Sequence, residues 1–165
     1  MNEKDFIHSL RKKFKLKGKI QKRQIWVEIR SDDLLKLCNY AKELGFRHLS
    51  TISVTDLVHI GKYELVYFLW SYENKTVLII KTIVSRKRPI IKSVSSVWEE
   101  GQIHERELHE LFGVEFKGNP DLSALFLEEW KQNPPFKKDF DWRKYVRRKY
   151  YTKKGSEKAY FEADK

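Results

Sequence analysis

Three consecutive stretches rich in β-branched and aromatic residues constrain the fold of this chain most. They cover residues 47–58, 63–72 and 76–84, and short turn-like segments separate them. Stretches of this length between turn residues are typical of strands joined by tight turns. The sequence therefore predicts a β-meander, and the alternation of apolar and polar residues in 24–30 predicts a fourth strand.

Apolar residues at helical spacing predict three helices around these strands. The helices cover residues 3–16, 32–44 and 104–112, with Ser31 as a possible cap of the second one. A glycine lies just beyond each of the three ends, where helices commonly stop. A mixed or antiparallel sheet of about four strands, with helices covering it, makes a two-layer α+β domain.

The charge of the chain is concentrated at its two ends. The 165 residues include 34 Lys and Arg and 23 Asp and Glu, a net charge of +11. Residues 1–30 carry +7, residues 31–130 carry −3 and residues 131–165 carry +7. We expect an α+β domain over residues 1–130 and an extended basic C-terminal arm over residues 131–165. The surplus indicates an anionic partner, which can be nucleic acid, phospholipid or an acidic protein subunit.

The residues that could act in catalysis or bind a metal do not form a recognisable catalytic motif. The single cysteine, Cys38, excludes an internal disulfide and a four-cysteine cluster. His104 and His109 are about 140° apart around a helix and cannot clamp one metal ion from one face. Nucleophile-elbow, dinucleotide-binding and phosphate-loop glycine motifs are missing from the sequence. We therefore expect no metal, cofactor or catalytic residue on this chain, and an enzyme using Glu105 or His109 is the last-ranked alternative.

The first residues and the basic tail bear on location and partners. The N-terminus is polar and then basic, unlike a secretory signal, and the apolar stretches fall far short of the roughly 20 residues that span a bilayer. A composition rich in Lys and Glu but poor in Gln is the bias of thermophile proteins. Residues 143–151 interleave cations with aromatic rings, which suits a nucleic-acid strand, an acidic neighbouring subunit, or a tail that is solvated or faces lipid.

A longer and more specific pattern occupies residues 104–140. A Glu-Arg-Glu triplet leads to an acidic residue, a Phe-Gly pair and Phe-x-Gly-x-Pro-x-Leu, and a Trp and Pro-x-Lys-Lys-Asp follow. The residues of this signature are Glu105, Arg106, Glu107, Glu110, Phe112, Gly113, Phe116, Gly118, Pro120, Leu122, Trp130, Pro135, Lys137, Lys138 and Asp139. Their order and spacing resemble the 30 kDa subunit of respiratory complex I, the NADH-quinone oxidoreductase of bacteria. They also resemble its relative in energy-converting membrane-bound nickel–iron hydrogenases.

Five positions depart from the usual pattern of that family. Asn119 stands where the family usually has His, and Ser123 stands where it usually has a basic residue. Phe136, Lys137 and Phe140 replace the usual Leu, Arg and Tyr. These departures and the short length point to a divergent branch, closer to the hydrogenase or archaeal versions.

The resemblance implies a cofactor-free accessory subunit in the peripheral arm of a membrane-bound, ion-translocating electron-transfer complex, on the cytoplasmic face of the cell membrane. The implied partners are a large subunit of the hydrogenase or complex I 49 kDa type, a small Fe–S subunit and integral membrane subunits. Fe–S clusters, and a NiFe centre in a hydrogenase, would lie on those partners, and no small-molecule substrate is expected here. The signature residues are expected at the subunit interface.

The leading interpretation is a complex of hydrogen metabolism that resembles membrane-bound hydrogenase. The alternative is a complex I-type quinone oxidoreductase that uses NADH, ferredoxin or F420H2. A stand-alone nucleic-acid-binding domain is the rival from another class, motivated by the basic ends of the chain.

Overall fold

A five-stranded mixed sheet organises the computed structural model, which describes residues 3–151. The strand order is β1-β2-β5-β4-β3, and two short strands form a separate sheet, β6-β7. The strands are β1 (Lys17–Gln21), β2 (Gln24–Glu28), β3 (His48–Leu57), β4 (Lys62–Ser71), β5 (Thr76–Ser85), β6 (Ile90–Lys92) and β7 (Glu115–Lys117). The helices are α1 (Glu3–Lys13), α2 (Leu34–Glu43), α3 (Gly101–Phe112) and α4 (Trp142–Tyr150), with single 3-10 turns at Ser31–Asp33 and Val58–Ile60.

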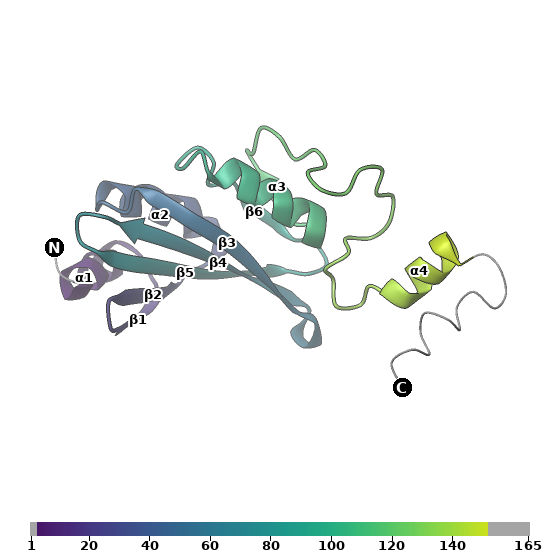
Figure 1. Cartoon of the computed structure of the whole chain (residues 1–165). Helices are drawn as coiled ribbons and strands as arrows, with labels where there is room; N and C mark the ends of the chain where they lie inside the picture. The colour runs from purple at the N-terminus through teal and green to yellow at the C-terminus, as the bar shows by residue number, and fades with distance from the viewer. Residues whose placement is uncertain (1–2, 152–165) are drawn as a thin grey trace.

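The core lies between one face of the sheet and the helices, and Figure 1 shows α2 and α3 along that side. Alternate residues of β4, among them Tyr63 and Leu65, are fully buried there. They share one apolar cluster with Phe6 of α1, Leu37 of α2 and Leu108 of α3. Each fully buried side chain of this size stabilises the fold by about 2 kcal/mol. The α+β two-layer prediction is confirmed.

The meander is confirmed, and the sheet holds one more strand than the four expected. Strands β3, β4 and β5 pair antiparallel, while β2 pairs parallel with β5 from Gln24 opposite Val77 to Glu28 opposite Lys81. Strand β1 pairs antiparallel with β2 at the sheet edge. Its sequence, Lys-Gly-Lys-Ile-Gln, is almost wholly exposed, so it lacks the alternation that marks a half-buried strand.

Two of the three helix ends agree with the glycine signals, and the expected cap is not formed. Helix α1 stops at Lys13, and Gly18 lies inside β1 rather than at the helix end. Ser31 begins a 3-10 turn without a side-chain capping bond, so the predicted cap is wrong. Gly45 (φ +96°) and Gly113 (φ +76°) adopt the left-handed conformation that ends a helix, as predicted.

The C-terminal arm differs from the extended segment we expected. Residues Trp142–Tyr150 form the helix α4, because the Asp141 side chain accepts a hydrogen bond from the Lys144 amide (2.9 Å) and caps its first turn. Residues 152–165 of the predicted arm lie outside the described residues. Within residues 3–151, none of the helices has the length and apolarity needed to cross a bilayer.

Candidate functional site

The carboxylate of Glu105 lies fully buried beneath α3 and joins three segments of the chain. It accepts hydrogen bonds from the Ser93 hydroxyl (2.6 Å), the Val94 amide (2.7 Å) and the Asn119 side-chain amide (2.8 Å). Burial raises the pKa of Glu105 above its usual value, and the hydrogen bonds oppose that rise. Since Ser93 and Val94 follow β6 and Asn119 follows β7, this carboxylate fixes both loops to the helix.

Arg106 and Glu110, one turn apart on α3, hold the loop that follows β7. The Arg106 guanidinium donates to two backbone carbonyls and pairs with a carboxylate, and Glu110 accepts three consecutive amides. The Arg106 contacts are to Ser123 O (2.8 Å), Ala124 O (2.6 Å) and Asp121 (3.3 Å). The Glu110 contacts are to the amides of Leu125 (3.1 Å), Phe126 (2.9 Å) and Leu127 (2.8 Å). Bonds of this charge-assisted kind fix an otherwise irregular loop.

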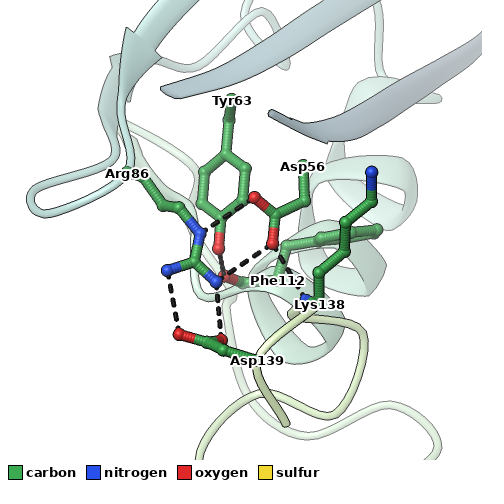
Figure 2. A network of polar contacts seen from close by, with 6 residues as sticks. All are labelled: Asp56, Tyr63, Arg86, Phe112, Lys138 and Asp139. Atoms are coloured by element: carbon green, nitrogen blue, oxygen red, sulfur yellow. Dashed lines mark hydrogen bonds and ion pairs between the residues drawn. The ribbon is translucent and has the colours of Figure 1, made fainter. Parts of the chain in front are cut away.

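A second polar network, the arginine clasp, attaches the C-terminal segment to the sheet (Figure 2). The clasp consists of Arg86, Asp56, Asp139 and the backbone amide of Lys138. Arg86 donates to both oxygens of Asp56 (2.8 and 3.1 Å) and to both oxygens of Asp139 (3.0 and 2.6 Å). The Lys138 amide also donates to Asp56 (3.0 Å). One guanidinium therefore bridges the end of β3 to a residue near the start of α4.

The clasp sets the pKa values of its two carboxyl groups. Burial alone would raise the pKa of Asp56, but hydrogen bonds from Arg86 and the Lys138 amide bring it below its usual value. Hydrogen bonds from Arg86 also lower the pKa of Asp139. Both groups are therefore ionised in the folded protein at neutral pH.

Tyr63 lies between the clasp and the end of α3. Its hydroxyl donates to the Phe112 carbonyl (3.2 Å), and its ring meets the Phe112 ring edge-on at 6.1 Å. The Arg86 guanidinium lies 5.9 Å from the centre of the Tyr63 ring. Burial, reinforced by the charge of Asp56, raises the pKa of Tyr63 to about 12.

The turn after α3 is shaped to receive the C-terminal segment. A Cβ added to Gly113 would lie 2.9 Å from Cγ of Pro134, closer than packed side chains approach. The Phe136 amide donates to the Leu111 carbonyl (3.0 Å), and the Phe136 and Phe112 rings meet edge-on at 5.7 Å. Only glycine satisfies both the left-handed backbone and this close approach.

Four aromatic rings pack together and hold α4 against the segment that precedes it. We call Trp130, Phe140, Trp142 and Tyr145 the aromatic cluster, whose shortest centroid distances are 4.9 Å (Trp130–Tyr145) and 5.0 Å (Phe140–Trp142). Rings at such distances contribute about 1 kcal/mol per pair beyond the area they bury. The cluster therefore positions α4 without drawing on the main core.

The signature residues outside these networks have several environments. Phe116 is buried in the core, and the carbonyl of buried Pro135 accepts a hydrogen bond from the Trp142 indole (3.1 Å). Glu107 is half-buried, and its carboxylate makes no hydrogen bond or ion pair with the rest of residues 3–151. The remaining ones are Gly118, with φ +98°, exposed Pro120, and half-buried Leu122 and Lys137.

Sequence reasoning missed the clasp. Asp56 lies on β3, Tyr63 on β4 and Arg86 just after β5, and no local motif joins them. Of the two histidines considered as ligands, His109 has its Nδ1 hydrogen-bonded to the Val114 carbonyl (2.8 Å). Residues 3–151 contain no group of three or more His, Cys, Asp or Glu side chains that could hold a metal ion.

Comparisons of the sequence find a family and curated relatives. Residues 27–146 match the family described as the 30 Kd subunit of respiratory-chain NADH dehydrogenase. The matching F420H2 dehydrogenase subunit of Methanosarcina mazei is 36% identical over 116 residues, covering 67% of this chain and 71% of the relative. The matching NADH-quinone oxidoreductase subunit of Moorella thermoacetica is 32% identical over 111 residues, covering 67% and 75%.

Solved structures share the fold. A chain from the membrane-bound sulfane sulfur reductase, an archaeal respiratory membrane complex, matches with a TM-score of 0.82 and 25% identity, covering 92% of this chain and 93% of that chain. A trypsin-resistant fragment of Nqo5 matches with a TM-score of 0.60 and 22% identity, covering 73% of this chain and 98% of the fragment. The second likeness speaks for the fold alone.

Proposed function

This chain belongs to the family of the 30 kDa subunit of respiratory-chain NADH dehydrogenase, and on that premise we propose that it is an accessory subunit of a membrane-bound electron-transfer complex. It holds no cofactor, lies in the peripheral arm on the cytoplasmic face of the membrane, and supports a large subunit of the hydrogenase or complex I 49 kDa type. Fe–S clusters lie on that subunit and its neighbours.

The observation that carries this proposal is the match, along nearly its full length, to a chain of a respiratory membrane complex. The polar contacts of the signature residues also support the proposal, because they are made within this chain. Glu105, Arg106, Glu110 and Asp139 all bind groups of this same chain. They fix the segment between α3 and α4 in one shape, which is what a scaffold for a neighbouring subunit requires.

The kind of complex is decided by the partner chains. We propose a hydrogenase-like complex first and a complex I-type quinone oxidoreductase as the alternative. The curated relatives are named as F420H2 dehydrogenase and NADH-quinone oxidoreductase subunits, and the structural relative belongs to a sulfane sulfur reductase. Nickel together with iron in the purified complex supports the first candidate, whereas iron without nickel supports the alternative or a sulfur-reducing relative.

The test is purification of the tagged chain from gently solubilised membranes of its native host, followed by mass spectrometry of the recovered chains. We expect a large subunit, a small Fe–S subunit and integral membrane subunits. Recovery of the chain by itself contradicts the proposal. A nuclease-sensitive association instead supports the nucleic-acid rival, since α4 carries five basic and no acidic residues.

A further inference from the structure

A groove of about 840 Å³ opens on the sheet where β2 comes to its end. It lies beside the last residues of β5 and the first residues of β4, and the turn from α1 into β1 borders it. Its apolar floor includes Leu16, Ile29 and Ile83, and Ile83 is 45% exposed. The groove is thus an apolar depression at a place where the sheet loses one of its strands.

The edge of β5 is open along this groove. Strand β2 ends at Glu28, opposite Lys81, whereas β5 continues to Ser85. On the side of β5 that faces β2, the Val77 amide donates to the carbonyl of Arg23, the residue before β2. The Lys81 carbonyl accepts a hydrogen bond from the amide of Ile29, the residue after β2. Residues two apart on a strand direct their backbone groups to the same side, so the groups of Ile83 and Ser85 also point away from β4.

No backbone bond within residues 3–151 occupies Ile83 or Ser85 on that side. Unpaired amides and carbonyls on a sheet edge are a template for an added strand. Proteins that add a strand in this way obtain affinity from the backbone bonds and specificity from the side chains around them. The groove therefore suits a polypeptide in extended conformation, because lipids and nucleic acids do not match the alternating donors and acceptors.

The rim of the groove is basic. Five of its side chains are Lys or Arg and two are Glu. Lys81 is paired with Glu64 (3.2 Å) and Arg30 with Asp32 (3.1 Å). The other three cations, Lys15, Lys17 and Lys62, have no acidic partner among the described residues. Charge complementarity thus favours acidic side chains on the occupant.

We propose that this groove binds an extended acidic segment of a partner subunit, which adds a short parallel or antiparallel strand to the free edge of β5 at Ile83 and Ser85. The proposal rests on the proposed function, because the occupant is a chain of the same complex. It adds a binding site on the sheet, remote in sequence from the signature of residues 104–140.

Photo-crosslinking in the intact complex tests the contact. Benzoylphenylalanine is placed at position 83 of the tagged full chain, and crosslinked peptides from the purified complex are identified by mass spectrometry. We expect one acidic segment of a partner subunit from position 83. The matched control is position 53, where an exposed serine lies on β3 outside the groove lining, and it should not yield that peptide.

A backbone variant tests the added strand. Ile83→Pro removes an amide that points into the groove and leaves every bond between β5 and β4 in place. We expect about fivefold lower recovery of the partner, with the circular dichroism of the isolated chain unchanged, whereas Ile83→Val keeps full recovery. Lys62→Glu should also lower the recovery of the partner at low salt. Lys12→Glu, which changes an exposed charge outside the groove, should leave that recovery unchanged.

The outcomes separate the two proposals. Partners recovered in full without a crosslink from position 83 overturn the groove proposal and leave the subunit function standing. Crosslinks to lipid, nucleic acid, a second copy of this chain or a basic segment also overturn it. A tagged chain that comes off the membranes alone overturns both.

Discussion

Arg86 and Asp139 stand 53 residues apart in the chain and form a two-point ion pair, with N–O distances of 2.6 and 3.0 Å. The same guanidinium holds buried Asp56 on its other side. The segment between α3 and α4 is therefore tied to the sheet through Arg86, which holds Asp139, and through Asp56, which accepts the Lys138 amide. Changes at either carboxylate have separable effects.

Asp139→Asn should loosen the C-terminal segment while the sheet stays folded. The Asp139 side chain is 60% exposed, so solvent screens the pair and the loss of stability should be only about 0.5–1 kcal/mol. Hydrogen exchange should speed up in residues 131–141 and not in β4. Glu128→Gln, at an exposed carboxylate without a partner in residues 3–151, is the control and should change neither measurement.

Asp56→Asn should destabilise the fold by about 3 kcal/mol at neutral pH, because it leaves a largely buried Arg86 with the exposed Asp139 as its remaining charge partner. The pKa of Asp56 is lower in the folded protein than in the unfolded chain, where Asp titrates near pH 3.9. Its contribution is therefore complete above about pH 4 and is lost as the pH falls through the folded pKa.

Urea unfolding measured from pH 7 down to pH 2 checks this sign. Below about pH 4, the unfolding free energy of the variant should decrease less steeply with falling pH than that of the parent protein. An equal acid dependence in both proteins would mean that Asp56 is not held ionised by the clasp.

Asn119→Asp should be much more harmful than Asn119→His. The aspartate puts a second carboxylate against buried Glu105, whose oxygen now receives the Asn119 amide at 2.8 Å. We expect a loss of about 2–3 kcal/mol at pH 7 that shrinks as the pH falls and the pair takes up a proton. The histidine keeps a donor at this position, and its thermal midpoint should stay close to that of the parent.

Gly113→Ala should cost more than Gly61→Ala. Both glycines have positive φ, so each alanine pays about 1 kcal/mol for the left-handed backbone. The methyl group at 113 also meets Pro134, whereas nothing lies within 4 Å of the corresponding position at Gly61. Differential scanning calorimetry should therefore rank Gly113→Ala as the less stable, and equal midpoints would contradict the docking of Pro134.

Glu107→Arg tests the subunit interface without disturbing the fold. This half-buried residue is the acidic signature side chain with no hydrogen bond or ion pair within residues 3–151. The isolated variant should keep its thermal midpoint, yet the tagged chain should recover less of its large partner from membranes. Glu128→Arg makes the same charge change on an exposed residue outside the signature, and it should leave recovery unchanged.

The parts of the fold that follow a local pattern could be predicted from the sequence. Each meander strand has its own β-forming stretch, and Gly45 and Gly113 mark helix ends because a left-handed residue needs little context. Strand β1 has no such pattern, since its side chains are almost wholly exposed and it is held by pairing with β2 and by the bond from Arg11 of α1 to the Gly18 carbonyl. The cap predicted at Ser31 failed because the chain enters α2 through a 3-10 turn.

The candidate site could be located from the sequence but not assembled from it. The signature gave the position of Glu105 and Asp139 within residues 104–140, yet not which groups they bind. Asp56 and Arg86 lie outside the signature, and only the antiparallel pairing of β3, β4 and β5 brings them together. A charged residue at the end of a strand has no local feature that distinguishes a clasp from an ordinary solvated side chain.

The clasp also orders events during synthesis. Strands β3, β4 and β5 have all left the ribosome once Ser85 emerges, and they can pair at once because their contacts are local. The ion pair between Arg86 and Asp139 can form only after 53 further residues have been synthesised. A chain interrupted between them keeps its meander but leaves Asp56 and Arg86 paired only with each other. The shape of the C-terminal segment therefore forms only in chains translated past Asp139, and assembly that recognises this shape excludes fragments that end before it.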